Sequence, residues 1–177
     1  MIDERLRSEV AATLRAIPDF PRPGIVFRDI TPLLASPTLF ADVTDAMADA
    51  YRDAGITHVV AVESRGFIFG APVAQRLKAA FVPVRKPGKL PLRAERFDYD
   101  LEYGRDALEI HADACDAAAM VLIVDDVLAT GGTVAAATRL VERLGARVAG
   151  STFLLEILGL SGRTALAPTR VEAFVSL

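Results

Sequence analysis

Apolar residues follow two alternating patterns along this chain. In some segments they recur every three or four residues, as on one face of a helix, and in others they form short unbroken runs, as in strands covered on both faces. The helical pattern occupies about residues 3–16, 37–50, 67–78 and 134–144. The strand pattern occupies about residues 57–62, 81–85, 120–124, 148–155 and 171–175. This alternation predicts an α/β fold with a doubly wound, mainly parallel central sheet flanked by helices.

Proline, serine and glycine mark several boundaries of these segments. Ser36 followed by Pro37 predicts an N-cap with proline in the first helical position. Pro83 cannot donate a backbone hydrogen bond, so the strand that contains it is expected at a sheet edge or a bulge. The prolines and glycine between residues 18 and 24 predict an irregular segment over residues 20–29.

One stretch departs from the strand and helix alternation. Residues 97–101 and 107–111 alternate between polar and apolar around Gly104, which predicts a β-hairpin. A polar hairpin inserted between the strands of a parallel core suggests a flexible lid over residues 87–116. We expect residues 1–177 to form one domain.

Composition narrows the class of protein. The chain has 177 residues, of which 52% are apolar, enough for one sizeable core. Its net charge of -3 argues against sequence-independent binding to nucleic acid, which needs a basic surface. Cys115 is the single cysteine, so a reducing, cytoplasmic location is expected. The N-terminus does not read as a signal peptide, and the longest apolar run, residues 117–124, is too short to cross a membrane.

The segment VLIVDDVLATGGT, residues 121–133, carries the clearest chemical signal. A buried strand leads to the carboxylates of Asp125 and Asp126, and a glycine-threonine loop then opens a helix. Carboxylates suit ribose hydroxyls or a hydrated metal ion, and loop amides at a helix N-terminus suit a phosphate. The segment has neither the lysine of a Walker loop nor a G-x-G-x-x-G pattern. A receiver domain is excluded because only 51 residues follow Asp126, and an ordinary strand-turn-helix is the remaining alternative.

This segment resembles the signature of the type I phosphoribosyltransferases. Four further segments resemble the adenine phosphoribosyltransferases within that family, in the family's order. They are FPRPGIVFRDITPLL (20–34), ESRGFIFGAP (63–72), RKPGKLP (85–91) and YDLEYG (99–104). The resemblance runs from about residue 18 to the end and implies transfer of the 5-phosphoribosyl group from 5-phosphoribosyl 1-diphosphate to N9 of adenine, giving AMP and diphosphate.

The resemblance also implies roles for the residues of the signature. The 5′-phosphate is expected on the amides of Ala129, Thr130, Gly131, Gly132 and Thr133, with the two threonine hydroxyls as further donors. Asp125 and Asp126 are expected to hold the ribose hydroxyls. The family requires Mg²⁺, which we expect the substrate to hold, with no direct side-chain ligand and the two aspartates acting through water.

Four basic residues are candidates for the leaving diphosphate. By resemblance Arg65 belongs to the diphosphate loop, and Arg85, Lys86 and Lys89 follow the next strand. Each alone is more often a solvated surface charge. Their position directly after parallel strands, where ligands bind, favours the functional role for Arg65 and Arg85.

The remaining family roles concern the base and the lid, and the resemblance also implies that residues 1–35 form a small N-terminal hood. Val26, Phe27 and Arg28 are expected to meet adenine through main-chain groups and a stacked ring, although Phe27 could be a plain core residue. Glu102 is the candidate acid/base group and Tyr103 is expected to pack at the reacting centre, with Arg65 as a third catalytic residue; a solvated hairpin charge is the alternative for Glu102. The family forms homodimers, so a homodimer is expected, with no nucleic acid or membrane partner.

Two other functions fit the binding loop. A phosphoribosyl-diphosphate-sensing regulator would keep the loop and lose catalysis, but such regulators carry a DNA-binding module, and the first 17 residues allow one helix only. An enzyme of the same fold that uses another purine is the second alternative, which the base-binding segment disfavours.

Overall fold

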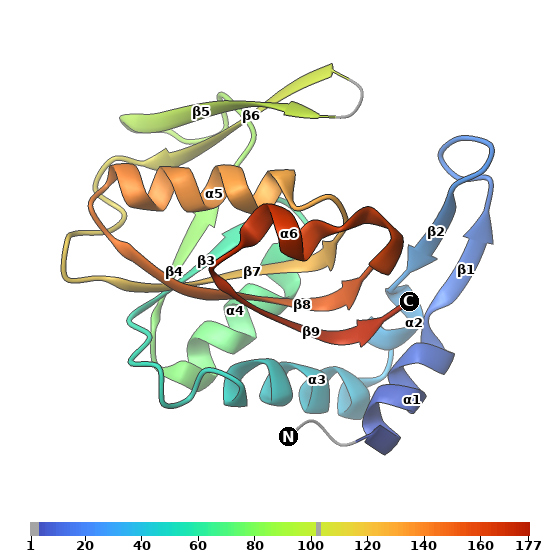
Figure 1. Ribbon diagram of the computed structural model, residues 1–177. Coiled ribbons are helices and arrows are strands. Elements are labelled where there is room, and N and C mark those ends of the chain that lie inside the picture. The colour runs from blue at the N-terminus through green and yellow to red at the C-terminus, as the bar shows by residue number, and fades with distance from the viewer. Residues whose placement is uncertain (1–3, 102–103) are drawn as a thin grey trace.

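The computed structural model describes residues 4–101 and 104–177. Its centre is a five-stranded parallel sheet in the order β4-β3-β7-β8-β9 (Figure 1). The strands are β3 His58–Val62, β4 Ala80–Val84, β7 Met120–Leu128, β8 Arg147–Glu156 and β9 Arg170–Ser176. The doubly wound parallel sheet expected from the apolar runs is therefore confirmed. Pro83 lies in β4 at the edge of this sheet, as its missing backbone donor predicts.

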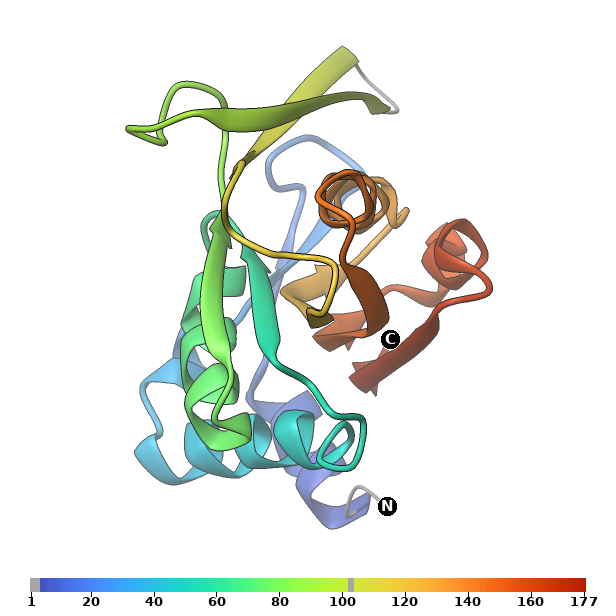
Figure 2. The ribbon, with the colours of Figure 1, turned by 90° about the vertical axis from the view of Figure 1, so that its left-hand side faces the viewer.

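Helices cover both faces of the sheet. Figure 2 shows α3 and α4 on one side and α5 on the other. The helices are α1 Glu4–Thr13, α2 Thr31–Leu34, α3 Pro37–Asp49, α4 Gly66–Leu77, α5 Gly132–Arg143 and α6 Gly162–Leu166, with a 3₁₀ turn at Leu158–Leu160. The hydroxyl of Ser36 accepts a hydrogen bond from the amide of Leu39 at 3.4 Å, so the predicted N-cap of α3 is confirmed.

Alternate residues of β3 and β7 supply two separate cores. Val59 of β3 packs into a cluster with α1, α3 and α4, whereas its neighbour Val60 packs into a second cluster with α5. Both side chains are fully buried. Because successive side chains point to opposite faces, a strand covered on both sides must be apolar throughout, which explains the unbroken runs in the sequence.

The N-terminal segment is more regular than its prolines suggested. Strands β1, Arg15–Pro18, and β2, Val26–Asp29, form an antiparallel pair in which Ile17 lies opposite Phe27. The prediction of an irregular segment over residues 20–29 is therefore wrong for residues 26–29, and α1 ends at Thr13, before the predicted boundary near residue 16. The prolines occupy the connection and the end of β1, so β2 needs no proline within it. The pair stands beside the carboxyl ends of β8 and β9 (Figure 1).

The predicted hairpin consists of β5, Ala94–Leu101, and β6, Gly104–His111, in antiparallel register. It lies over α5, where the guanidinium of Arg143 sits 4.8 Å from the ring centre of Phe97 (Figure 2). Arg143 also donates to the carbonyl of Arg96 at 2.8 Å. Arg85 and Glu109 exchange backbone hydrogen bonds of 2.9 and 2.8 Å, which join the hairpin to the end of β4.

The strand order places a crevice between β3 and β7. From β3 the chain crosses to β4 on one side, and after the hairpin it continues on the other side through β7, β8 and β9. Ligands of doubly wound folds bind at such a switch point, outside the carboxyl ends of the strands. Arg65, which follows β3, and Asp126, in β7, are thereby brought to one edge of the sheet.

Candidate active site

The loop after β7 forms one side of the site. β7 continues through Asp125 and Asp126 to Leu128, paired with β8, so both carboxylates lie within the strand and the prediction that it ends near residue 124 is wrong. Gly131 has φ +84°, a backbone conformation that favours glycine, and α5 begins at Gly132. No described side chain caps this helix. The amides of residues 129–133 therefore stand at an uncapped helix N-terminus, an arrangement that suits a phosphate.

Arg65 connects two parts of the site. Its Nε atom lies 2.9 Å from Oδ2 of Asp126, and its guanidinium carbon lies 5.3 Å from the centre of the Phe27 ring. The side chain of Asp126 is only 6% exposed, and Oδ2 accepts no aligned hydrogen bond from the described residues. An ion pair without an aligned hydrogen bond leaves this oxygen able to accept one from a ligand hydroxyl or a water.

Burial controls the charge of the two aspartates. Removal from water raises the pKa of Asp125 well above its usual value, and the neighbouring carboxylate of Asp126 raises it further. Burial also raises the pKa of Asp126, against the opposing effect of Arg65. Gly66 contributes to this burial, because a Cβ atom there would lie 2.9 Å from Oδ1 of Asp125. Among the described residues, the positive charge of Arg65 therefore favours the charged form of Asp126.

A cleft of about 530 Å³ lies between the N-terminal strand pair and the sheet. Its walls are mainly apolar, which suits a planar base. It is lined by Gly24, Ile25, Val26, Phe27, Arg28, Arg65, Val127, Ala129, Ile157, Gly159, Leu160 and Leu177. β2 pairs with β1 along one edge, and among the described strands its other edge has no partner. Main-chain groups of β2 are therefore free to meet a ligand.

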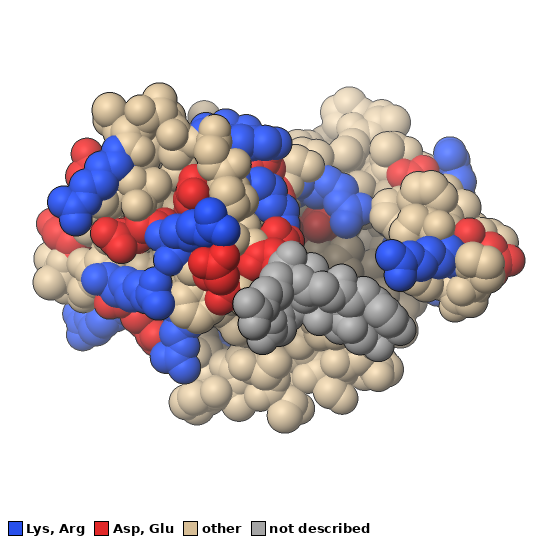
Figure 3. Space-filling model, turned by 90° about the horizontal axis from the view of Figure 1, so that it is seen from above, with Lys and Arg blue, Asp and Glu red and all other residues tan. Residues whose placement is uncertain are grey.

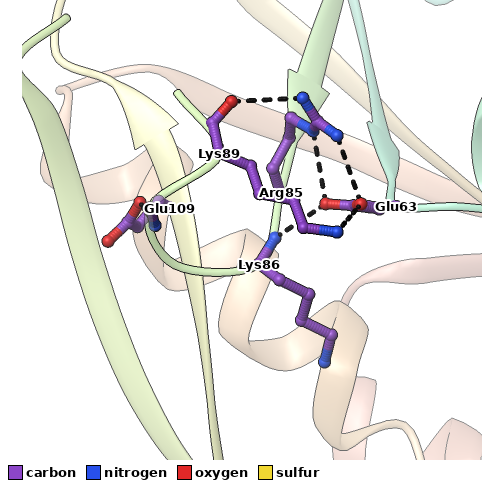
Figure 4. Close-up of polar contacts among 6 residues, drawn as sticks. Glu63, Arg85, Lys86, Lys89 and Glu109 are labelled. Carbon is purple, nitrogen blue, oxygen red and sulfur yellow. Dashed lines mark hydrogen bonds and ion pairs between the residues drawn. The ribbon is translucent and has the colours of Figure 1, made fainter. Parts of the chain in front are cut away.

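Three predicted diphosphate ligands gather around Glu63, at the end of β3 (Figure 4). Arg85 donates to both oxygens of Glu63 through Nε and Nη2, each at 3.2 Å. The amide of Lys86 donates at 3.0 Å and the Lys89 ammonium at 2.8 Å. The Lys89 and Arg85 hydrogen bonds lower the pKa of Glu63 to about 2, against the effect of its partial burial. The carboxylate therefore holds the cationic loop together in its charged form.

The side chain of Lys86 points elsewhere. It forms an ion pair with Asp106 of β6, and the hydroxyl of Tyr99 in β5 donates to the same carboxylate at 3.2 Å. Lys86 thus ties the hairpin to the loop that follows β4. Seen from above, acidic and basic side chains lie next to one another on this face (Figure 3).

The structure brings the predicted residues together in two groups. Val26, Phe27, Arg28 and Ala129 line the cleft, and Arg65 lines it as well while pairing with Asp126. Arg85, Lys86 and Lys89 instead form a second group around Glu63. The predicted catalytic residues Glu102 and Tyr103 lie outside the described residues.

Sequence reasoning missed the wall formed by Ile157, Gly159 and Leu160. These residues follow β8 at the carboxyl edge of the sheet, and that position is the signal that could have identified them. Glu63 was also missed as a functional residue. A single acidic residue at the end of a strand, facing a run of cations after the neighbouring strand, is the pattern that marks it.

Residues 29–163 of this chain match the family model described as "Phosphoribosyl transferase domain". Adenine phosphoribosyltransferase from Acaryochloris marina is 52% identical over 167 residues, which cover 94% of this chain and 98% of that protein. The corresponding protein from Carboxydothermus hydrogenoformans is 55% identical over 159 residues, which cover 90% of this chain and 94% of that protein.

Solved structures agree with these sequence relatives. Adenine phosphoribosyltransferase from Thermoanaerobacter pseudethanolicus superimposes with a TM-score of 0.94 at 46% identity, over 97% of this chain and 99% of that one. The Saccharomyces cerevisiae enzyme, solved with adenine and an imino-altritol bisphosphate, gives a TM-score of 0.91 at 39% identity, with 97% and 99% of the two chains covered. With the signature loop, the cleft and the sheet order all in place, this chain belongs to the adenine phosphoribosyltransferase family.

Proposed function

We propose that this protein transfers the 5-phosphoribosyl group from 5-phosphoribosyl 1-diphosphate to N9 of adenine in purine salvage, releasing AMP and diphosphate. The observation that carries this proposal is the single cleft shared by the Phe27 segment and the loop that begins at Ala129, with Arg65 between them. Structures of relatives support the choice of base. The Saccharomyces cerevisiae enzyme was solved with adenine and the Giardia lamblia enzyme, 37% identical, with 9-deazaadenine.

The base site would use Val26, Phe27 and Arg28. The free edge of β2 presents main-chain donors and acceptors to the cleft, and the Phe27 ring lies beside it. Adenine offers an N6 donor beside an N1 acceptor, whereas hypoxanthine offers these in the reverse order. A backbone pair fixed in a strand cannot reverse its polarity, so it should reject oxopurines.

The ribose and its 5′-phosphate would lie between β7 and the start of α5. Amides of Ala129, Thr130, Gly131, Gly132 and Thr133 would bind the phosphate, with the threonine hydroxyls as further donors. Asp125 and Asp126 would accept hydrogen bonds from the ribose hydroxyls and orient C1′. Their negative charge would also favour the oxocarbenium-like transition state that forms as the bond from C1′ to diphosphate breaks.

The leaving diphosphate would meet Arg65 and the basic loop after β4. Arg85, Lys86 and Lys89 surround one carboxylate in this structure, so the loop is already arranged to receive anionic oxygens. Lys89 is the most available of the three, since its side chain is 50% exposed. Negative charge grows on the diphosphate during the reaction, and fixed cations stabilise it more in the transition state than in the ground state.

The residues of the site fit a Mg²⁺ ion that the substrate holds. Mg²⁺ prefers oxygen ligands and retains several waters. Asp126 Oδ2 is a buried carboxylate oxygen without an aligned hydrogen bond, which suits an ordered water. Within residues 4–101 and 104–177, no group of three or more His, Cys, Asp or Glu side chains could hold a metal ion. Asp125 and Asp126 would act through water, and the cation would neutralise charge on the diphosphate.

The remaining roles are proposed from the family resemblance. Glu102 would take the proton that N9 of adenine loses as the new bond to C1′ forms, and Tyr103 would pack at the reacting centre. The hairpin within residues 87–116 would act as a lid that excludes water. Residues 1–35 would form the hood over the base, and the whole chain would form one domain.

We also propose that the protein forms a homodimer. Light scattering should then give a mass twice that of the 18.9 kDa chain. No described helix is long and apolar enough to cross a membrane. The single cysteine suits the reducing cytoplasm, where we place the reaction.

A rate comparison among purines tests the function. Initial rates with adenine, hypoxanthine, guanine and xanthine, each with 5-phosphoribosyl 1-diphosphate and Mg²⁺, should show activity with adenine at least about 10⁴ times that with any oxopurine. AMP and diphosphate should form in equal amounts. A preference for an oxopurine, or no turnover with adenine, would refute the proposal.

A further inference from the structure

The start of α6 meets the phosphate loop with no side chain between them. Gly162, the first residue of α6, is buried. A Cβ atom at this position would collide with the carbonyl oxygen of Ala129 and would lie 2.7 Å from Cδ1 of Leu128. The Ala129 oxygen belongs to backbone and cannot swing away as the tip of a long side chain can. Glycine is therefore required at residue 162 for the two segments to approach this closely.

The contact is reciprocal. Gly131 has φ +84°, and a Cβ atom placed on it would lie 2.8 Å from the carbonyl oxygen of Gly162. A third link is the hydrogen bond from the amide of Ile157 to the carbonyl of Leu128, at 2.9 Å. The backbone of residues 128–131, where β7 leads into α5, therefore packs directly against the backbone of residues 157–162.

We propose that Gly162 is a positioning residue for the phosphate loop. This inference rests on the proposed function, in which the amides of residues 129–133 bind the 5′-phosphate. The carbonyl of Ala129 and the amide of Thr130 belong to one planar peptide unit, so a displacement of the oxygen turns the N–H as well. By leaving room for that oxygen, Gly162 keeps the Thr130 amide directed at the ligand.

The same segment also forms part of the cleft. Ile157, Gly159 and Leu160 line it together with residues of the N-terminal strands, and Gly162 follows two residues after Leu160. The wall beside the base and the support behind the phosphate loop are therefore one continuous stretch of chain. A purely structural glycine would affect stability alone, whereas a positioning glycine also affects the affinity for the phosphorylated substrate.

The substitution Gly162→Ala tests the proposal. We expect the Kd for 5-phosphoribosyl 1-diphosphate, measured by calorimetry with Mg²⁺, to rise at least about tenfold, because a misplaced loop loses several amide contacts together. The KM for this substrate should rise by a similar factor, and kcat should change less than KM. The Kd for adenine alone should change by less than about threefold, because Phe27 and β2 are left in place.

Gly150→Ala is the matched control. Gly150 is a buried glycine of β8, where a Cβ atom would collide with the hydroxyl of Tyr51 and lie 2.8 Å from the carbonyl of Arg170. It should therefore lower the melting temperature without changing the affinity for 5-phosphoribosyl 1-diphosphate. If both folded variants bind this substrate as tightly as the wild type does, Gly162 is not a positioning residue. The same conclusion follows if both substitutions lower the affinity for this substrate by the same factor.

A second variant guards against misfolding of Gly162→Ala. Ala165 is exposed, and its Cβ atom lies 3.1 Å from where a Cβ atom of Gly131 would be. Ala165→Val should crowd the loop from the same side and raise the Kd for 5-phosphoribosyl 1-diphosphate by about threefold or more. An unchanged Kd in this folded variant would overturn the inference. Failure of the wild-type protein to bind this substrate would instead refute the proposed function.

Discussion

Glu63 shows how one acidic residue can organise a cationic site. Its two oxygens accept hydrogen bonds from Arg85, Lys86 and Lys89. Arg85 also donates through Nη1 to the carbonyl of Lys89, at 3.1 Å. Without an anion among them, these cations would repel one another and the loop would have many conformations. The carboxylate therefore acts as an internal counter-ion, and in the proposed reaction it would compete with the diphosphate for Lys89.

The low pKa of Glu63 predicts a dependence of stability on pH. Its pKa is lowered from 4.5 to about 2 in the folded protein. The charged carboxylate therefore stabilises the fold above about pH 4.5, and this contribution is lost as the pH falls from 4.5 to 2. At pH 7 we expect Glu63→Gln to lower the free energy of unfolding by about 1–2 kcal/mol, and this difference should shrink between pH 4.5 and pH 2.

Urea unfolding of wild type and variant at a series of pH values measures this difference. Glu142→Gln is a suitable control, because the Glu142 side chain is 48% exposed and pairs only with Arg139 among the contacts described for it. The control should differ from the wild type by less than about 0.5 kcal/mol. A Glu63→Gln difference that stays constant down to pH 2 would contradict the assigned role.

At the scale of single residues, the sequence predicted which residues lie at the site better than it predicted which side chains contact one another. Asp126 and Arg65 were both expected at the site, because a strand of a parallel sheet delivers its end to the ligand edge. Their ion pair could not be predicted, since it depends on β3 lying beside β7. Glu63 went unnoticed for the same reason: its partners lie on the neighbouring strand's loop rather than near it in the sequence.

Among the elements, the N-terminal strand pair shows where periodicity fails. Pro18, Pro21 and Pro23 are strong breakers, and they concealed a strand at Val26–Asp29 that contains no proline. β7 shows a related error, because Asp125 and Asp126 suggested that the strand ends near residue 124, whereas it continues to Leu128. A charged residue can remain in a strand when a partner such as Arg65 offsets part of the cost of burial.

Polar contacts of Asp106 help to hold the β5–β6 hairpin in place, which leads to a prediction about its dynamics. Asp106 accepts from both Lys86 and Tyr99 and so ties the hairpin to the loop after β4. Asp106→Asn should weaken this tie and speed amide hydrogen exchange in β5 and β6 by about three- to tenfold, with little change in global stability. Exchange measured by mass spectrometry checks this.

Glu95→Gln is the control for this experiment. Glu95 lies in the same hairpin, but it pairs only loosely with Arg93, at 3.8 Å, among its described contacts. Exchange in the hairpin should stay at the wild-type rate in this variant. Equal effects of the two substitutions would mean that Asp106 has no special part in fastening the hairpin.

Over the whole molecule, the fold was predictable and the assembled site was only partly so. Continuous apolar runs such as Val59–Val60 require cover on both faces, and alternation with helices then leaves a doubly wound sheet as the solution. The wall at Ile157 and Leu160 depends on how the end of β8 lies opposite β2. Local sequence carries no signal for such a contact, because neither segment has an unusual composition.

Arg65 predicts an energetic coupling between the two substrate sites. It lies over the Phe27 ring and pairs with Asp126, which belong to the proposed base site and the proposed ribose site. Diphosphate oxygens should draw Arg65 away from the ring and leave its face free for the base. We therefore expect an unreactive base, 9-deazaadenine, to bind about five- to fiftyfold more tightly when 5-phosphoribosyl 1-diphosphate is present.

Calorimetric titrations with and without the cosubstrate measure the coupling, which must be reciprocal for the two ligands. Arg65→Ala should reduce it to less than about threefold, while Arg76→Ala, on the far turn of α4, should preserve it. Identical affinities for 9-deazaadenine in the two titrations of the wild type would show that the sites are independent.

The contact between Gly162 and the Ala129 carbonyl also bears on how the protein is made. The phosphate loop leaves the ribosome before its support does, because residues 129–133 precede α6 in the sequence. A nascent chain that ends after α5 already contains every residue of the signature, yet it lacks the segment against which the loop is set. Substrate binding should therefore arise only after α6 and β9 have been synthesised, when the domain closes as a unit.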